Sequence, residues 1–417
     1  MMSKMYWMRL LIFIIILALI EYYAFIAIRF AVKEVHSPYK QLLIGLYVAL
    51  TLIWFGLLFM VPMMRHGDFD KTLRNVIISF ALGFLLTKLI IAVILLIDDL
   101  RRGGYFFASL FSAKDGISPA IESGMTRSDF IAKCALLFGG TVFATVLYGM
   151  SNRYNYHVKK IKLSYDNLPS SFKGLRIVQI SDIHSGSFND TLAVQKGIDM
   201  ILEQKPDVIF FTGDLVNNKS EEMQDYMSVF SKLNAPLGVY SILGNHDYGD
   251  YVEWQSVEEK LNNLNQLKDI HAKMGWRLLL NEHVLLQKEE ETIAVIGVEN
   301  ISYRNRFHSY GDLKKAYDGT QNHAFKILLS HDPSHWDGEV NSKYADIDLT
   351  LSGHTHGAQF GIEIPGLKWS PIQYMYKQWA GVYQNEKQYL YVNRGFGFLG
   401  YPGRVGILPE ITVIDLV

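Results

Sequence analysis

Five short polar motifs follow one another in the second half of the chain, and each contains side chains that bind metal ions. They are Ser181-Asp182-Ile183-His184, Gly213-Asp214, Gly244-Asn245-His246-Asp247, Ser330-His331-Asp332 and Gly353-His354-Thr355-His356. Imidazole and carboxylate groups are the ligands that Zn, Mn and Fe prefer. Within Asp-x-His and His-x-His the two side chains are two residues apart, so on an extended backbone both point the same way and can hold one ion. The pattern therefore favours metal-dependent chemistry.

Each of these motifs has a plainer interpretation, in which its histidine is a hydrogen-bonded loop residue. A single Asp-x-His or His-x-His is common by chance, and only the repetition of such motifs favours a metal site. For five histidines outside the motifs we adopt the plainer interpretation. These are His271, His283, His308, His323 and His335.

Short apolar runs precede the motifs and have the length and composition of buried strands. The runs are 175–180, 208–212, 239–243, 327–329 and 347–351, and a last run covers 411–416. Amphipathic stretches at 192–203, 221–233 and 257–274 predict helices between them. Alternating strands and helices predict a layered α/β core with its site at the strand ends. Gly213, Gly244 and Gly353 would let the chain turn just before a ligand.

Composition excludes several classes of partner and site. Lys plus Arg number 40 and Asp plus Glu 41, which gives a net charge of −1, so nucleic acid is not indicated as a partner. The single cysteine, Cys134, excludes a disulfide framework and a thiolate metal cluster. Any metal site must therefore use His, Asp and Asn.

The first 150 residues have the composition of a membrane anchor. About 20 consecutive apolar residues can span a bilayer as a helix, and the stretches 10–28, 42–64, 76–97 and 130–150 qualify. We therefore predict a transmembrane unit over 1–150, a linker over 151–170 and a soluble domain over 171–417. The first stretch also resembles a signal peptide, but it lacks a small-residue cleavage site and three further spans follow it.

The charges beside the spans weakly orient them. With four spans, nine basic residues fall on the side of the soluble domain and seven on the other. Basic residues favour the cytoplasmic side, so this small excess predicts a cytoplasmic catalytic domain.

Glu21 and Lys88 fall inside the predicted spans, where an ionisable side chain is costly unless it is paired or faces a polar cavity. They would form a pair or contact a lipid head group, or each would extend toward an interface or face another helix. We favour the second interpretation.

The order of the five motifs, DxH, GD, GNHD, SHD and GHTH, resembles that of the calcineurin-like metallophosphoesterase superfamily, and the resemblance covers roughly 171–417. A span just before this region, and the tail NRGFGFLGYPGRVGILPEI, look like the bacterial membrane-bound branch, which includes the UDP-2,3-diacylglucosamine pyrophosphatases. The resemblance implies a four-layer αββα sandwich after the helical anchor. It also implies an integral protein of the bacterial inner membrane.

The resemblance further implies that seven side chains bind two divalent ions, whose identity as Mn, Fe or Zn the sequence leaves open. One ion would be held by Asp182, His184, Asp214 and His356. The other would be held by Asp214, Asn245, His331 and His354. Two such ions lower the pKa of a shared water and neutralise phosphoryl oxygens.

The catalytic roles carried over from the family fall on His246, which would face the substrate, and Asp247, which would fix the orientation of that imidazole. One departure is Asn217, which occupies a position where many relatives have an acid. No metal ligand is lost by it, but the charge around the ligands differs.

The function implied is hydrolysis of a phosphodiester, phosphomonoester or pyrophosphate. The alternative is a catalytically silent membrane sensor or scaffold that binds metal or a lipid head group. Location beside a bilayer favours a lipid-linked substrate, although soluble esters remain open. Aromatic residues could form a wall for acyl chains or pack the domain onto its own helices: Trp369, Tyr374, Tyr376, Trp379, Phe396 and Phe398. Arg394 and Arg404 are candidate anion contacts, or members of surface salt bridges.

Overall fold

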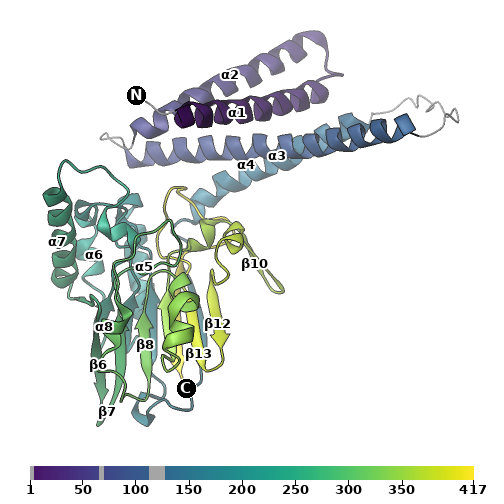
Figure 1. Ribbon diagram of the computed structural model, residues 1–417. Coiled ribbons are helices and arrows are strands. Elements are labelled where there is room, and N and C mark those ends of the chain that lie inside the picture. Colours follow the sequence, from purple (N-terminus) through teal and green to yellow (C-terminus); the bar gives the residue numbers. More distant parts are fainter. Residues whose placement is uncertain (1–3, 65–69, 112–126) are drawn as a thin grey trace. The chain divides into compact units, whose positions relative to one another are not determined.

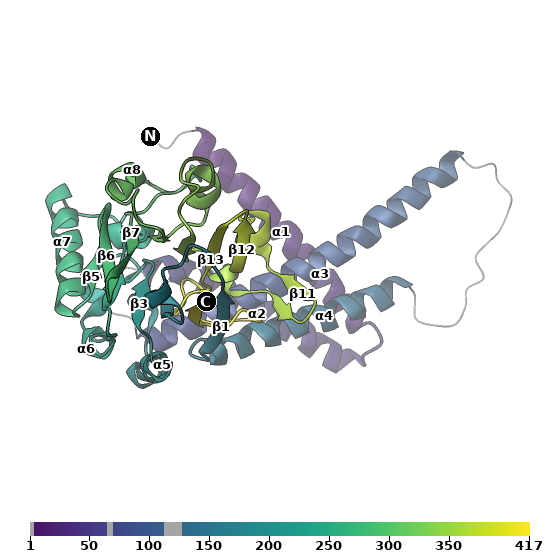
Figure 2. The same ribbon diagram turned by 90° about the horizontal axis from the view of Figure 1, so that it is seen from below.

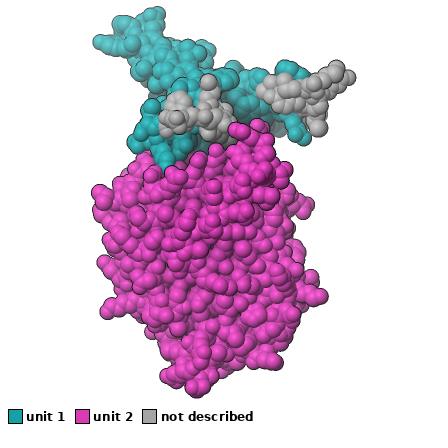
Figure 3. Space-filling view, turned by 90° about the vertical axis from the view of Figure 1, so that its left-hand side faces the viewer, with its two compact units in different colours: residues 1–148 teal, residues 149–417 magenta. Residues whose placement is uncertain are grey.

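A computed structural model describes residues 4–64, 70–111 and 127–417. Arg65 and Lys114, which enter the comparison of basic residues above, lie outside these ranges. The chain forms two compact units, residues 1–148 and 149–417, which Figure 3 colours separately. Each unit is described by itself.

In the part of the N-terminal unit that the structure describes, the chain forms four helices (Figure 1). They are α1 (Lys4–Ala31), α2 (Ser37–Met63), α3 (Lys71–Phe111) and α4 (Arg127–Gly149). All four are long and apolar enough to cross a membrane. Only 11% of the apolar window is buried in α1 and α2, and 33% in α3, so most of their apolar side chains point outward, as contact with lipid requires. The predicted spans are confirmed.

The two ionisable residues within the spans form a pair, and the interpretation that each extends alone to an interface is wrong. Lys88, on α3, is 2% exposed and donates a hydrogen bond to Glu21, on α1. It also donates to Thr51 Oγ1, on α2, at 2.9 Å, while the Tyr47 hydroxyl donates to Glu21 Oε1 at 2.6 Å. Burying one charge alone is costly. The paired charges and their hydrogen bonds to residues on three helices therefore have a lower free energy than two separately buried charges.

The C-terminal unit contains two six-stranded sheets and a short hairpin. In spatial order the first sheet comprises β1 (His157–Leu163), β14 (Glu410–Leu416), β2 (Arg176–Ile180), β3 (Val208–Phe211), β4 (Val239–Ser241) and β5 (Arg277–Leu278). The second comprises β12 (Gly381–Asn385), β13 (Gln388–Val392), β9 (Leu349–Ser352), β8 (Lys326–Leu329), β7 (Glu291–Gly297) and β6 (Glu282–Lys288). The hairpin is β10 (Ile362–Ile364) and β11 (Leu367–Trp369).

The sheets face each other across a dry core, and helices cover their outer faces. Phe210 and Ile177 of the first sheet pack against Val295, Ile327 and Leu351 of the second. The outer face of the first sheet carries α5 (Thr191–Glu203), α6 (Met227–Phe230) and α7 (Val257–Lys273). The second carries α8 (Leu313–Tyr317) and α9 (Asn341–Lys343). Figure 2 shows α5 and α6 on one side of the two sheets and α8 on the other. The αββα sandwich is confirmed.

Two local expectations differ from the structure. The stretch 151–170, expected as a linker, contains β1, which pairs in parallel with β14. Its mixed lysine and apolar pattern suits an edge strand, which is exposed on one face. The stretch 221–233, expected as one helix, forms a 3-10 turn over Ser220–Met223 and the single-turn α6. Here Glu222 accepts hydrogen bonds from the backbone N–H groups of Asn217 and Lys219, which ties the segment to the preceding loop.

Candidate metal centre

The five motifs meet because parallel strands present their carboxyl ends at one edge of a sheet. Strands β2, β3 and β4 pair in parallel, as do β8 and β9 in the other sheet. The loops after these five strands contain the motifs. Stacking of the two sheets then brings both edges together, and their side chains form two adjacent groups.

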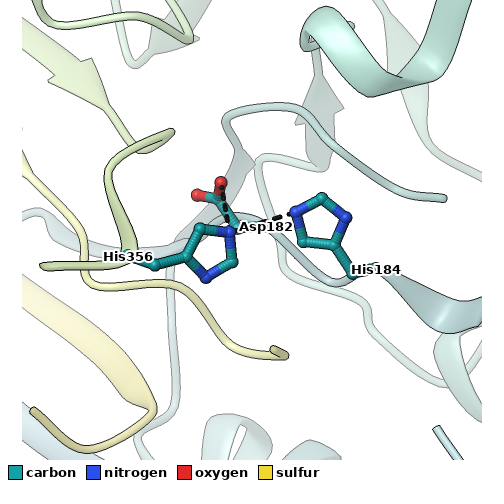
Figure 4. Close-up of side chains that lie close together, drawn as sticks. All are labelled: Asp182, His184 and His356. Carbon is teal, nitrogen blue, oxygen red and sulfur yellow. Dashed lines mark hydrogen bonds and ion pairs between the residues drawn. The ribbon is translucent and has the colours of Figure 1, made fainter. Parts of the chain in front are cut away.

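The first group is Asp182, His184 and His356, whose potential ligand atoms lie within 4.8 Å of one another. His356 Nε2 lies 3.2 Å from Asp182 Oδ1 and 3.0 Å from His184 Nε2. Figure 4 shows the two imidazoles turned toward each other beside the carboxylate. All three residues are buried. A carboxylate and two imidazole nitrogens at this spacing can hold a metal ion.

The second group is Asp214, His331 and His354, again with potential ligand atoms within 4.8 Å. His331 Nε2 lies 3.1 Å from Asp214 Oδ2, and the same oxygen lies 3.6 Å from His184 Nε2 in the first group. Asn245 joins this group because its Oδ1 lies 2.8 Å from His354 Nδ1. Asp214 therefore contacts both groups, as a bridging carboxylate would.

Outward hydrogen bonds turn the lone pairs of the second group inward. His331 Nδ1 donates to the carbonyl of Thr212 at 2.7 Å, which turns its buried Nε2 toward Asp214 Oδ2. The Asn245 amide nitrogen donates to the Tyr251 hydroxyl at 2.8 Å, which turns Oδ1 toward the site. His354 Nε2 lies 2.9 Å from the Tyr376 hydroxyl. Nitrogen and oxygen atoms of the second group thus point toward one buried place, and a divalent cation there would satisfy their lone pairs.

The charge states also suit metal binding, which requires neutral imidazole and ionised carboxylate. Burial lowers the pKa of His184 well below its ordinary value and lowers the pKa of His354. Burial would raise the pKa of Asp214, but the surrounding imidazoles, His331 first, hold it well below its ordinary value. Burial would lower the pKa of His331, but the Asp214 and Asp182 carboxylates raise it to about 10, so this imidazole must release a proton when a metal binds. The site thus holds an anion beside the neutral imidazoles of His184 and His354.

Five of the candidate ligands adopt the left-handed backbone conformation, which differs from the extended geometry expected for the two-residue spacings. Their φ angles lie between 50° and 71°, and they are Asp182, His184, Asp214, His354 and His356. This conformation costs about 1 to 3 kcal/mol for each non-glycine residue and occurs mostly at functional sites. The convergence of these side chains is therefore produced by sharp turns after the strands.

Two glycines make these turns possible. Gly213 has φ +96°, a conformation that side-chain-bearing residues rarely adopt. A Cβ atom on Gly353 would clash with Ser181 Oγ and Asp182 Oδ2. Any side chain there would displace a candidate ligand.

The structure gives Asp247 a different role from the expected one. Its carboxylate accepts backbone hydrogen bonds from Gly244 at 2.8 Å, Asp214 at 2.9 Å and Leu215 at 2.8 Å, so it fixes the loop of the bridging residue. The His246 imidazole is held instead by the carbonyl of Asn217, 2.8 Å from Nδ1. The expectation that Asp247 orients this imidazole is wrong, because its oxygens are taken by the backbone.

Comparison with known proteins agrees with this geometry. Residues 8–153 match the family model described as the transmembrane domain of a probable calcineurin-like phosphoesterase, and residues 175–358 match the calcineurin-like phosphoesterase model. A Bacillus subtilis protein, the uncharacterized metallophosphoesterase YkuE, is 32% identical over 60% of this chain and 81% of its own. The chain belongs to the calcineurin-like phosphoesterase family.

Two further relatives come from an animal and a bacterium. The Danio rerio transmembrane protein with metallophosphoesterase domain is 29% identical over 75% of this chain and 70% of its own. The Chlamydia trachomatis UDP-2,3-diacylglucosamine pyrophosphatase LpxG is 28% identical over 55% of this chain and 81% of its own. Because the relatives include animal proteins, the comparisons leave the organism and the membrane open.

Arg394 and Arg404, the two arginines expected to contact an anion, are buried in the interior of the phosphoesterase unit. Arg394 is bound by Glu410 and by Glu363, the latter at 2.7 Å. Arg404 donates to backbone carbonyls, among them that of His356 at 3.2 Å. Neither is available to a substrate, because a buried guanidinium needs these internal partners.

The proposed aromatic wall is also largely wrong for this phosphoesterase family member. Phe396 and Phe398 are buried in the core beneath α5 and α6, and Trp379 packs in a small internal cluster. Tyr374 is 78% exposed. Alternating burial along an irregular tail cannot be deduced from composition, which explains the error.

Sequence reasoning missed several residues beside the second group. The Tyr376 hydroxyl, next to His354 Nε2, donates to Asp332 Oδ2 at 3.3 Å. The Phe307 ring lies 4.6 Å from the His354 ring, edge to face. Nearby, Arg304 lies over the Tyr376 ring at 5.1 Å. Of these residues, the sequence had singled out only Asp332, as part of the Ser-His-Asp motif, and Tyr376, as one of six aromatic residues with no assigned place at the metal centre.

Proposed function

We propose that this chain is a membrane-anchored phosphoesterase that uses two divalent metal ions to hydrolyse a phosphodiester, phosphomonoester or pyrophosphate. One observation carries the proposal: a single buried carboxylate, Asp214, contacts both groups of potential ligands. A shared carboxylate between two imidazole-rich groups is the arrangement that a dinuclear hydrolytic site requires.

The residues proposed to hold the ions are the seven assigned from the sequence. Asp182, His184, Asp214 and His356 would hold one ion. Asp214, Asn245, His331 and His354 would hold the other. Bound there, the ions would supply Lewis acidity, lowering the pKa of a water molecule and neutralising phosphoryl oxygens. Mn, Fe and Zn all accept this donor set.

His246 is proposed to act on the substrate. Its backbone N–H donates to Asp214 Oδ1 at 2.8 Å, and its Nδ1 faces the Asn217 carbonyl. A carbonyl oxygen can only accept a hydrogen bond, so Nδ1 must be the donor and carry the hydrogen. Nε2 is then left to exchange a proton with the leaving oxygen or to stabilise transition-state charge. Asp247 would support this step indirectly, by fixing the Asp214 loop.

The substrate class is proposed from location and charge. The helical unit keeps the site at a membrane surface, which favours a lipid-linked phosphoester or pyrophosphate. The relative named as a UDP-2,3-diacylglucosamine pyrophosphatase supports this choice. Arg304 and Arg306 are exposed and lower the pKa of Tyr376 by their charge, although burial dominates and raises it. Because Tyr376 contacts His354 of the second group, these two cations are candidates to bind a further anionic group of the substrate.

The experiment uses the purified full chain, stripped of metal with chelator and reloaded with Mn, Fe, Zn or Mg. Hydrolysis of bis-p-nitrophenyl phosphate should appear on reloading and disappear again with chelator. Asp214→Asn should lose bound metal and activity together, whereas His246→Ala should keep metal and lose about 100-fold or more in turnover. A His246→Ala variant with normal turnover would refute its assigned role. A panel of lipid pyrophosphates and soluble diesters then narrows the substrate.

The alternative is a silent sensor that binds metal or a head group. Both groups of potential ligands are complete, which favours catalysis, since a sensor has no need of a complete second site. Metal binding without hydrolysis of any ester in the panel would favour the sensor. The cytoplasmic placement of the catalytic unit is likewise a proposal, which protease protection in oriented vesicles tests.

A further inference from the structure

A cavity of about 480 Å³ opens in the helical unit, where the charged ends of the helices meet. Arg29 and Lys33 follow the apolar part of α1, Lys40 lies near the start of α2, and Arg102 follows the apolar part of α3. Its inner wall is apolar, with Ile26, Phe30 and Leu95. The cavity thus combines a basic mouth with an apolar floor.

The sequence order places this cavity at head-group depth. The charged lining residues lie just outside the apolar stretches 10–28, 42–64 and 76–97, and stretches of about 20 apolar residues match the thickness of the hydrocarbon layer. Charged residues there lie level with phosphate groups of the lipids. If each helix crosses once, this end of the unit lies on the membrane side opposite the phosphoesterase unit, which follows the fourth helix directly.

The charges around the cavity do not cancel. Its two carboxylates already have partners: Asp98 accepts from Arg101 at 2.7 Å, and Asp99 accepts from Arg102 and from the Tyr23 hydroxyl. Lys33 lies 3.4 Å from Asp129. Arg29 and Lys40 form no ion pair with any residue that the structure describes. Two cations therefore remain at the mouth of the cavity.

We propose that this cavity binds the phosphate-bearing head group of an anionic lipid. Guanidinium and ammonium groups recognise phosphate oxygens through charge-assisted hydrogen bonds. Basic pockets between transmembrane helices are a recurrent form of anionic-lipid site. The apolar floor would receive the start of an acyl chain, which a soluble phosphate ester lacks. If each helix crosses once, this lipid lies in the leaflet away from the start of the phosphoesterase unit and is not the substrate of the metal centre.

The test measures lipids that remain bound to the purified full chain in mild detergent, by native mass spectrometry. The chain is offered equal amounts of phosphatidylglycerol and phosphatidylcholine, which differ in net charge. We expect clear preference for phosphatidylglycerol, reduced about tenfold in the double variant Arg29→Gln/Lys40→Gln. The matched control, Lys71→Gln/Arg74→Gln, removes two cations from the other end of α3 and should bind as the unaltered chain does.

A second variant guards against loss of folding. Asp99→Asn removes one carboxylate and leaves Arg102 only its longer contact with Asp98, at 3.6 Å, so it should increase retention of phosphatidylglycerol. Unchanged retention in Arg29→Gln/Lys40→Gln, or an equal loss in the control, would overturn the proposal. Displacement of the lipid by millimolar glycerol 3-phosphate would overturn a lipid occupant in favour of a soluble phosphate ester. Hydrolysis of a soluble diester should be the same in all these variants, which separates this site from the proposed catalysis.

Discussion

Removing the Tyr376 hydroxyl should weaken one metal site and spare the other. The Tyr376 oxygen lies 2.9 Å from His354 Nε2 and donates to Asp332. If His354 binds metal through Nδ1, its Nε2 carries the proton and donates it to this hydroxyl. These two hydrogen bonds connect the His354 imidazole to the Asp332 carboxylate, and they orient the imidazole and increase its basicity. The substitution Tyr376→Phe removes both of them.

The size of the effect follows from what can replace the lost contact. Loss of such an orienting partner typically costs 10- to 100-fold in metal affinity, or about 1.4 to 2.7 kcal/mol. Asp332 Oδ2 already lies 3.6 Å from His354 Nε2, so a small movement permits a direct bond. We therefore expect a loss near tenfold, at the lower end of this range.

The assay is calorimetric titration of the metal-free chain with Mn or Zn. The unaltered chain should bind two equivalents, and Tyr376→Phe should bind one equivalent with unchanged affinity and the second about tenfold more weakly. Tyr374→Phe is the matched control, because its hydroxyl is exposed and two residues away. Equal titration curves for Tyr376→Phe and the unaltered chain would refute the reasoning, as would equal weakening of both equivalents.

Three further predictions concern other parts of the chain. Burial lowers the pKa of His271 to about 3, so its contribution to stability is complete above its unfolded pKa near 6.5 and is lost as the pH falls toward 3. Between pH 7 and pH 5 the free energy of unfolding should drop by about 2 kcal/mol more in the unaltered chain than in His271→Leu, measured by denaturant titration. Arg306→Gln should raise the KM for an anionic diester several-fold with little change in kcat, whereas Arg277→Gln, on a distant strand, should leave both unchanged. Lys88→Met should destabilise the chain by about 3 kcal/mol, because it leaves Glu21 as an unpaired charge, and adding Glu21→Gln should restore part of that loss; additive effects in thermal melting would contradict the pairing.

Much of the fold was predictable because its signals are local. Four apolar stretches give four helices, and β-branched runs at 175–180 and 208–212 give β2 and β3. The strand β1 was missed, because its exposed lysines hide the alternation of an edge strand. The pair of Glu21 and Lys88 was considered but not favoured, since 67 residues separate them and only helix packing brings them together.

The sequence alone identified the candidate metal ligands, since ligand chemistry belongs to residue type, and the family resemblance implied their division into two groups. Only the tertiary structure decided how they are held. It turned Asp247 toward the backbone, buried Arg394 and Arg404 among internal partners, and brought Tyr376 beside His354. These outcomes depend on which loops meet after two sheets stack, and such contacts between distant residues leave no local pattern in the chain.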